Sequence, residues 1–459
     1  MDTRNIDNIS VLMLPWLAHG HISPFLDLAK TLCTRNFSIY LCSTPINLDS
    51  IKTKITDKWS SLIHLVELDV PALPDLPPHY HTTNGLPPHL MVTLKTAFAN
   101  SSPEFENIFE SVKPDLLIYD FNQPWAADIA LSKNVPAVQF HMSSTFFASF
   151  LNYKLSSDPA KTFPFPVPLH KYFTEKMNAI QEPSPEDAKD IDRVKEAGKR
   201  TYKIILRRTF REIEGKYVDY LSVLSRKKII PVGSLVQEIQ EDTNDAAEII
   251  QFLDKKNESS VVFVSFGSEY FLSKEEIQEI AYGLELSRLN FIWVVRFPFG
   301  ENMELQETLP LGFLDRVGDR GLVMEGWAPQ AKILRHSSTG GFVSHCGWGS
   351  IMESMMFGVP VIAMPMQTDQ PFNAIVVKEV GVGQEVERDE NGRFKREEIA
   401  EVIRNVVLEK RGETVRRKAK EMREKIRENG EKEIDDVAEE LVKLCKEKKD
   451  EIASSRMLQ

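Results

Sequence analysis

Short apolar runs of β type alternate with segments of helical spacing along most of this chain, and this alternation constrains the fold more than any other feature. Residues 10–16, 37–42, 115–119 and 137–140 are predicted strands, and residues 22–32 have the apolar spacing of a helix. A helix between two strands returns the chain to the same end of the sheet, so the strands pair in parallel. The first half therefore predicts a parallel sheet with helices on both faces.

The same alternation restarts in the second half. Strands are predicted at 261–266, 291–295, 341–344 and 359–364, and a helix at 274–286. At 459 residues the chain is long enough for two domains, each with its own core. In sheets of this kind ligands bind beyond the carboxyl ends of the strands, so we expect the chemically active side chains directly after strands.

A polar stretch separates the two halves. Residues 229–245 have no periodic pattern over most of their length, and we interpret them as an interdomain linker. The predicted organisation is an N-terminal α/β domain at 1–232, a linker at 233–250 and a C-terminal α/β domain at 251–435, with a cleft between the domains. The chain ends in charged helical sequence, and we expect the last helix, 436–459, to pack back on the N-terminal domain.

Charge and composition exclude several classes of protein. The chain has 56 basic and 67 acidic residues, a net charge of −11, which argues against binding to nucleic acid or to an anionic membrane. The start of the chain has no apolar signal core, and no apolar run approaches the roughly 20 residues that a membrane-spanning helix needs. Four cysteines form neither a CxxC pair nor a metal-ligand cluster: Cys33, Cys42, Cys346 and Cys445. We expect a cytoplasmic monomer with reduced thiols, no bound metal and no membrane insertion.

The densest candidate site is the segment 340–354, in which a predicted strand leads through a glycine-rich turn into a helix. Such a turn offers backbone N–H groups and a positive helix end to a phosphate, and His345 and Ser350 add side-chain donors. Ser350 and Glu353 also fit a capping box that only starts a helix, so both interpretations stay open. Met352 stands where a dinucleotide fingerprint has its third glycine, which disfavours a nicotinamide oxidoreductase.

Three further residues follow predicted strands. Ser268, in a Gly-Ser turn, offers a hydroxyl to the same anion, although the turn also fits an ordinary strand-to-helix loop. His21 lies where a strand joins a helix, and the positive helix end favours the neutral imidazole that a general base needs. Asp120 ends the strand 115–119 and can orient that imidazole, as the aspartate of a catalytic triad does. The alternative is that the histidine and the aspartate have only a structural role at the ends of their strands.

One long segment resembles the signature box of the plant secondary-product UDP-glycosyltransferases. It begins with Trp-Ala-Pro-Gln at Trp327, passes through His-Cys-Gly-Trp at His345 and ends with Asp-Gln at Gln370, with the spacing of the family throughout. The Gly-His-Ile element around His21 and the Tyr-Asp strand end at Asp120 also fit. The resemblance implies the GT-B architecture of two facing Rossmann-like domains, with the acceptor bound in the first domain and the UDP-sugar in the second.

The resemblance also implies roles for single residues. The expected catalytic residues are His21 and Asp120. Trp327 and Ala328 begin the box and Trp327 would stack on uracil, while Gln330 and Glu353 would lie at the ribose. The diphosphate would be held by Ser268, His345 and Ser350 in the turn that also contains Trp348 and Gly349. Asp369 and Gln370 would bind the sugar hydroxyls, and Gln370 resembles the form usual in glucose users. UDP-glucose is the expected co-substrate, and no cofactor or metal is implied.

Position 349 departs from the family pattern. The family usually has Asn between Trp348 and Ser350, whereas this chain has Gly349. A side-chain amide that could donate to a phosphate is absent, although the backbone N–H of Gly349 remains. Because a hydrogen bond to a charged group contributes roughly 1.5–3 kcal/mol, the change bears on donor affinity more than on the type of reaction.

A finer resemblance concerns the acceptor. Residues 15–21, 42–49, 82–90 and 265–271 resemble the branch-forming members of the family, which add a sugar to the sugar of an existing glycoside. The expected reaction inverts the anomeric carbon and yields a β-glycoside of a small plant-type metabolite. Direct transfer to a flavonoid or terpenoid aglycone is the alternative, and a non-catalytic UDP-sugar binder is a remote one. Candidate acceptor contacts, which also fit core positions, are Phe121, Trp125, His141 and Ser143.

Overall fold

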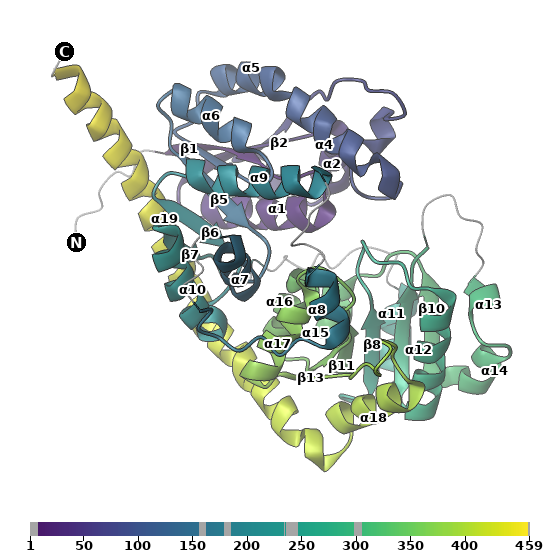
Figure 1. Cartoon of the computed structure of the whole chain (residues 1–459). Helices are drawn as coiled ribbons and strands as arrows, with labels where there is room; N and C mark the ends of the chain where they lie inside the picture. Colours follow the sequence, from purple (N-terminus) through teal and green to yellow (C-terminus); the bar gives the residue numbers. More distant parts are fainter. Residues whose placement is uncertain are drawn as a thin grey trace.

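The computed structural model describes residues 8–155, 162–178, 185–233, 235, 247–297 and 305–457, which form two parallel sheets covered by helices (Figure 1). Within these residues the first sheet has the strand order β3-β2-β1-β4-β5-β6-β7. Its strands are β1 (Ile9–Leu14), β2 (Phe37–Ser43), β3 (Ile63–Glu67), β4 (Leu116–Tyr119), β5 (Ala137–His141), β6 (Ile204–Arg207) and β7 (Lys228–Pro231). The helices of this half are α1 (His19–Cys33), α2 (Pro45–Lys52), α3 (Asp57–Ser60), α4 (Met91–Asn100), α5 (Ser102–Val112), α6 (Pro124–Ser132), α7 (Thr145–Leu155), α8 (Lys171–Asn178), α9 (Pro185–Arg200) and α10 (Arg211–Ser225).

The second sheet has the order β10-β9-β8-β11-β12-β13 among the described residues. Its strands are β8 (Val261–Ser265), β9 (Asn290–Val295), β10 (Gly321–Glu325), β11 (Thr339–Ser344), β12 (Val361–Ala363) and β13 (Gly383–Glu385). The helices of this half are α11 (Ala247–Asp254), α12 (Lys274–Ser287), α13 (Leu305–Thr308), α14 (Phe313–Val317), α15 (Gln330–Arg335), α16 (Trp348–Phe357), α17 (Gln370–Val380), α18 (Arg396–Val407) and α19 (Glu413–Met457). None of the helices in the described ranges is both long and apolar enough to span a membrane.

Each sheet reverses its strand order once, and this reversal places the site. In the first sheet the reversal lies between β1 and β4, and in the second between β8 and β11. The crossover helices leave on opposite sides of the sheet at such a point, which opens a crevice at the carboxyl ends of the two strands. The predicted fold class, α/β with two Rossmann-like domains, is confirmed by these two sheets.

Each sheet lies within one of the two predicted domains. All of β1 to β7 lies within 1–232, and all of β8 to β13 lies within 251–435. Residues 229–231, interpreted as part of the linker, belong to β7, and residues 247–250, predicted as its end, form the first turn of α11. Most of the remaining linker lies outside the described residues. Helix α8 belongs to the first domain by sequence but packs on the second, because the Arg388 guanidinium lies 5.0 Å from the Tyr172 ring centroid. The boundaries themselves stay predictions.

The last helix, α19, connects the two halves of the molecule (Figure 1). It begins at Glu413, where Ala419 and Met422 pack in an apolar cluster with residues of α16 and α17. Farther along, Val437 and Leu441 join the core beneath the first sheet. The boundary predicted at residue 435 therefore falls inside one continuous helix that serves both domains.

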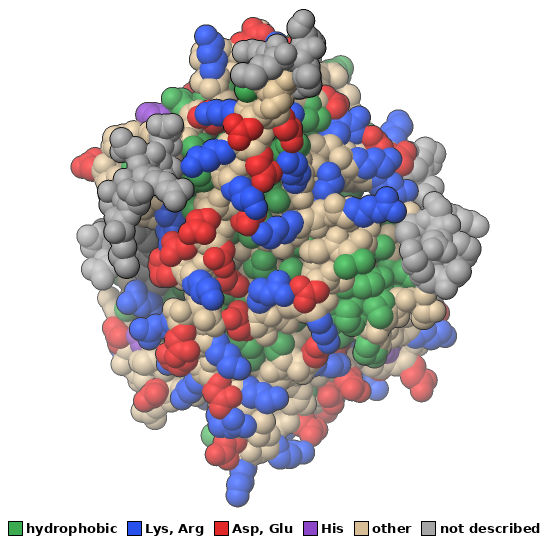
Figure 2. All heavy atoms as spheres, turned by 90° about the vertical axis from the view of Figure 1, so that its left-hand side faces the viewer, with side chains coloured by type: hydrophobic (Ala, Val, Ile, Leu, Met, Phe, Trp, Pro, Cys, Tyr) green, Lys and Arg blue, Asp and Glu red, His purple; other side chains and the backbone are tan. Residues whose placement is uncertain are grey.

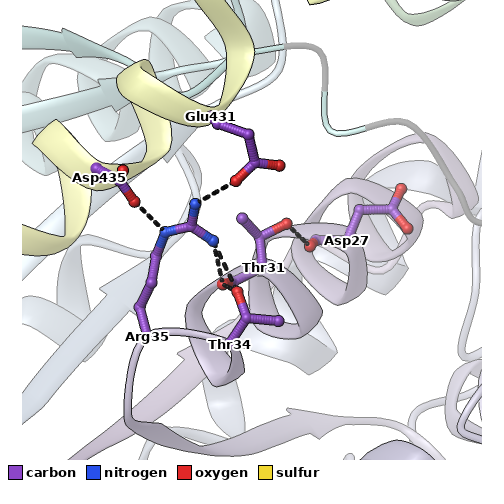
Figure 3. Close-up of polar contacts among 6 residues, drawn as sticks. All are labelled: Asp27, Thr31, Thr34, Arg35, Glu431 and Asp435. Atoms are coloured by element: carbon purple, nitrogen blue, oxygen red, sulfur yellow. Dashed lines mark hydrogen bonds and ion pairs between the residues drawn. The ribbon is translucent and has the colours of Figure 1, made fainter.

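Polar contacts also join α19 to the end of α1 in the first domain. Arg35, just after α1, donates to Glu431 at 2.7 Å and to Asp435 at 2.8 Å, and Figure 3 shows the guanidinium between the two carboxylates. Such exposed pairs contribute about 1 kcal/mol or less, so the apolar stripe carries most of the attachment. On the face shown in Figure 2, acidic and basic side chains are intermixed, as solvated helix surfaces require.

A buried carboxylate holds the start of α7 beside the interdomain cavity. Glu214 is fully buried, and its two oxygens accept the backbone N–H groups of Thr145 at 2.8 Å and Phe146 at 2.9 Å. The Thr209 hydroxyl donates to the same carboxylate at 2.7 Å. This cap sets the segment that carries Ser143, so it links the core of α10 to the acceptor side of the cavity.

We expect Glu214→Ala to lower the free energy of unfolding by about 3 kcal/mol, because two buried backbone donors lose their acceptor. Urea unfolding followed by circular dichroism measures this change. The matched control is Glu212→Ala on the exposed side of the same helix, with an expected change below about 1 kcal/mol. Equal effects of the two substitutions would show that the buried cap contributes nothing particular.

Candidate active site

The carboxyl ends of both sheets border one cavity of about 2260 Å³. Its lining includes Trp16 after β1 and Phe121 after β4 in the first domain. From the second domain it includes Ser268 after β8 and His345 after β11. Side chains at both strand-order reversals thus face a common space, and the cleft that the sequence predicts between two domains is present.

His21 lines this cavity, and its imidazole is hydrogen-bonded to the fully buried Asp120. The Nδ1 atom of His21 lies 2.7 Å from Oδ2 of Asp120. The carboxylate is held in place by two backbone groups, since Trp16 N–H donates to Oδ2 at 3.0 Å and Phe121 N–H donates to Oδ1 at 2.7 Å. A carboxylate only accepts, so Nδ1 carries the proton and Nε2 has the free lone pair. That lone pair is what a general base uses.

The charge environment of His21 differs from the sequence expectation. Burial lowers its pKa, but the adjacent Asp120 carboxylate, with Glu269 and Asp369 farther away, outweighs burial and raises the pKa above its ordinary value. The sequence analysis expected the helix end to favour the neutral imidazole. The structure shows that the nearby carboxylates have the larger effect and favour the protonated form. A raised pKa makes Nε2 a stronger proton acceptor, and the carboxylate stabilises the imidazolium that results.

The imidazole of His345 is held between two glycine turns. A Cβ atom at Gly267 would lie 2.5 Å from Nε2 of His345, and one at Gly347 would lie 2.4 Å from the same atom. Gly267 also has a φ of +76°, which disfavours other residues. Burial lowers the pKa of His345 to about 4, so the ring is neutral, and its Nδ1 has no partner among the described residues.

Helix α16 begins directly after this histidine. Gly347 is its N-cap, no side chain caps it, and its first turn has no acidic residue. The capping-box alternative for Ser350 is therefore wrong, because Ser350 lies inside the helix. Instead, Gln330 donates to the Ser350 hydroxyl at 3.2 Å and to Glu353 at 2.9 Å. The uncapped N-terminus leaves backbone N–H groups for an anion, in line with the phosphate interpretation.

The remaining residues of the predicted donor site line the same cavity. Trp327 is 64% exposed, and its ring lies edge-on to His19 with centroids 5.1 Å apart. The side-chain oxygen Oε1 of Gln370 accepts the backbone N–H groups of Met366 and Gln367, both at 2.9 Å, which leaves the side-chain NH₂ group for a ligand. Asn373 donates to Asp369 at 3.1 Å.

Two of the predicted site residues, Trp348 and Trp125, use their side chains for contacts within the protein. Trp348 is buried, and its indole N–H donates to the Arg208 carbonyl of the first domain at 2.6 Å. Its N–H therefore joins the domains and is not available to UDP. Trp125 is absent from the cavity lining and packs edge to face on Phe98 and Phe105, with centroids 5.7 and 5.4 Å away. Its ring is part of the aromatic packing of the first domain, and this position does not support the predicted contact with the acceptor.

The other predicted acceptor residues line the cavity next to His21. The ring of Phe121 lies 5.5 Å from that of His21. His141 also lines the cavity, and its pKa lies well below the ordinary value, first because of burial and then because of Arg207 and His21. The Ser143 hydroxyl accepts from Arg207 at 3.0 Å. Ala328, predicted on the donor side, is buried at the cavity edge.

Sequence reasoning missed Arg208, which lines the cavity at the end of β6. The signal was present, because two consecutive arginines follow the apolar run that forms β6, and residues after strands were expected to be active. Residues 204–207 form this strand, but the sequence analysis did not identify it. Asp27 of α1 was missed for another reason: burial raises its pKa to about 7, and nothing in the local sequence indicates that burial.

Comparisons with known proteins identify the family. Residues 7–237 match the model described as "Glycosyltransferase, N-terminal domain", and residues 226–415 match "UDP-glucoronosyl and UDP-glucosyl transferase". UDP-glucosyltransferase 29 of Panax ginseng is 56% identical over 98% of this chain and 100% of its own length. The β-D-glucosyl crocetin β-1,6-glucosyltransferase of Gardenia jasminoides is 51% identical over 95% and 99%. The crystal structure of Glycyrrhiza uralensis UGT73P12 complexed with glycyrrhetinic acid 3-O-monoglucuronide has a TM-score of 0.84 at 25% identity, covering 98% of both chains. The chain therefore belongs to the plant family 1 UDP-glycosyltransferases and is an enzyme that transfers a sugar from a UDP-sugar to a small molecule.

Proposed function

We propose that the enzyme is an inverting glucosyltransferase that moves glucose from UDP-glucose to a hydroxyl on the sugar of an existing small-molecule glycoside. The observation that carries the proposal is that His21, oriented by its hydrogen bond to Asp120, lines one cavity with Trp327, His345 and Gln370 of the other domain. A general base of the first domain thus shares a space with the residues that resemble the family's donor box.

The proposed reaction is one in-line displacement. Nε2 of His21 removes the proton of the acceptor hydroxyl, and the oxygen attacks the anomeric carbon of the α-linked glucose. The bond between that carbon and the UDP oxygen breaks, and UDP leaves from the opposite face with the bonding electrons. Attack from the face opposite the leaving group inverts the carbon, so the product is a β-glucoside.

Charge that develops on the leaving UDP needs donors at fixed positions. The free N–H groups at the start of α16 and the hydroxyls of Ser268 and Ser350 are candidates for this role. The neutral imidazole of His345 can also donate one hydrogen bond without adding a charge. No metal is invoked, because the chain itself supplies these donors to the diphosphate.

At the sugar end, acidic and neutral groups favour a neutral hexose. Asp369 and Glu269 line the same cavity as His21, and their carboxyl groups contribute to its raised pKa. A uronic acid donor would place a further carboxylate in this region. Like charges repel, and this supports glucose over glucuronic acid. Gln370 adds an amide NH₂ group for a sugar hydroxyl.

A glycoside acceptor is supported by the relatives and by the size of the cavity. The name of the Gardenia jasminoides relative contains β-D-glucosyl crocetin, and the Glycyrrhiza uralensis structure is a complex with glycyrrhetinic acid 3-O-monoglucuronide. A cavity of about 2260 Å³ exceeds the roughly 300–1,000 Å³ typical of a single drug-sized ligand, so it has space for a donor and an extended acceptor.

The test is incubation of the purified enzyme with UDP-glucose and matched pairs of aglycone and monoglucoside. We expect the monoglucoside to gain one hexose and the aglycone to react at least about tenfold more slowly, by mass spectrometry, with a β-linkage by NMR. UDP-glucuronic acid is the matched donor control and should give little product. Faster reaction of the aglycone would favour direct aglycone glucosylation. UDP binding without turnover on any acceptor would point to a non-catalytic binder.

A further inference from the structure

Arg208 of the first domain lies at the N-terminus of α16 in the second domain. It follows β6, is only 5% exposed and lines the interdomain cavity. Its carbonyl oxygen accepts the Trp348 indole N–H at 2.6 Å, which ties its backbone to the first residue of α16. The guanidinium is therefore held next to the turn at which the proposed function places the diphosphate.

The glycine at position 349 has a steric explanation in this arrangement. A Cβ atom at Gly349 would lie 3.0 Å from Nη1 of Arg208. The guanidinium thus occupies the space in which a side chain at 349 would begin. The amide that the resemblance leads us to expect at 349 is missing, and a cationic donor from the other domain stands in its place.

The Arg208 guanidinium lies in an environment suited to binding an anion. Burial lowers the pKa of Arg208, and the carboxylates of Glu353 and Asp27 oppose that effect. The adjacent helix end is positive and has neither a side-chain cap nor an acidic residue in its first turn. A guanidinium donates through a planar fork that fits phosphate oxygens.

We propose that Arg208 binds the diphosphate of the UDP-sugar, in place of a side-chain amide at position 349. The proposal rests on the proposed function, which puts the donor at α16. It adds that the two domains bind the diphosphate jointly, the second through the N-terminus of α16 and the first through Arg208. The affinity of the enzyme for UDP should therefore depend on Arg208, whereas its affinity for uridine, which has no phosphate, should not.

Calorimetric titration with UDP and with uridine tests this assignment. We expect Arg208→Gln to weaken UDP binding about 10- to 100-fold, the effect of losing one hydrogen-bonded charge, and uridine binding by less than about twofold. Arg208→Lys should keep part of the UDP affinity, because the charge remains but the fork is lost. Unchanged uridine binding also shows that the variant is folded.

A double-mutant cycle with position 349 makes the test specific. Gly349→Asn alone should weaken UDP binding about tenfold, because the new side chain competes with the guanidinium for space. In the Arg208→Gln background the same substitution should strengthen UDP binding about tenfold, because the space is free and the amide can donate to the phosphate. In steady-state kinetics these changes should appear in the KM for UDP-glucose more than in kcat.

Three outcomes would overturn the assignment. Arg208→Gln could leave UDP affinity unchanged, it could weaken UDP and uridine equally as a purely structural residue would, or Gly349→Asn could have the same effect in both backgrounds. Failure of the proposed function looks different, since the unmodified enzyme would then bind UDP but form no glucosylated product with any acceptor.

Discussion

His21→Ala is expected to lower kcat on the order of 10²- to 10⁴-fold while UDP affinity stays within about twofold of that of the unmodified enzyme. The substitution removes the only proton acceptor that we assign to the acceptor hydroxyl, but it touches none of the groups assigned to UDP. Steady-state kinetics at saturating donor and acceptor give kcat, and calorimetric titration with UDP gives the affinity. A loss confined to kcat indicates a group that acts in the chemical step.

His19→Ala is the matched control for this experiment. His19 lies two residues before His21 on the same helix, lines the same cavity and has its ring edge-on to Trp327. Burial, with Lys54 and Arg296, lowers its pKa to about 4, so it is a poor base. We expect His19→Ala to change kcat by less than about tenfold. Near-normal turnover of His21→Ala would show that another group removes the proton.

The positions of the catalytic pair were predictable because they depend on local sequence. A strand that ends in a helix start at His21, and a second strand that ends at Asp120, are each visible within ten residues. In a parallel sheet all carboxyl ends lie at one edge, so two such ends can meet even though 99 residues separate them. Only the strand order, with β1 beside β4, remained to be supplied by the structure.

Features that depend on how the two domains meet were not predictable. Trp348 fits the family box, yet its indole N–H is used by a carbonyl 140 residues away in the other domain. The end of helix α19 was expected to pack on the first domain, but nothing in its apolar spacing indicates that the start of the same helix packs on the second. The raised pKa of His21 has the same origin, since two of the acids that raise it lie across the cavity.

Trp125 and Arg208 show that the sequence did not predict which side chains line the cavity: Trp125 was wrongly included and Arg208 was missed. Trp125 follows a strand end and is aromatic, so the sequence favoured a ligand contact, but its ring fills the space between Phe98 and Phe105. Arg208 follows β6, which the sequence analysis did not identify, and lines the cavity. The end of a strand predicts where the backbone lies relative to the cavity. The packing of the neighbouring helices decides which side chains point into the cavity.

Asp120→Asn is expected to lower kcat by a similar factor, on the order of 10²- to 10⁴-fold, although the substitution keeps the shape of the side chain. Asp120 accepts three hydrogen bonds, from Trp16 N–H, Phe121 N–H and the His21 imidazole. An asparagine has one oxygen to offer, so its NH₂ group must face at least one of these donors. When it faces His21, the imidazole turns to the other tautomer, Nε2 carries the proton, and the base cannot act.

The pH dependence separates this role from a purely structural one. In the unmodified enzyme the carboxylates hold the pKa of His21 above its ordinary value, and the base works only when it is neutral. Activity should therefore rise with pH through that raised pKa. Without the Asp120 charge, burial is the main remaining influence and lowers the pKa, so the acid limb of kcat/KM should move to lower pH in Asp120→Asn. Asp115→Asn, at the other end of the same strand, should leave the limb in place because Asp115 pairs with Ser10 and Lys449 outside the cavity. An unmoved limb in Asp120→Asn would mean that His21 does not titrate as the base.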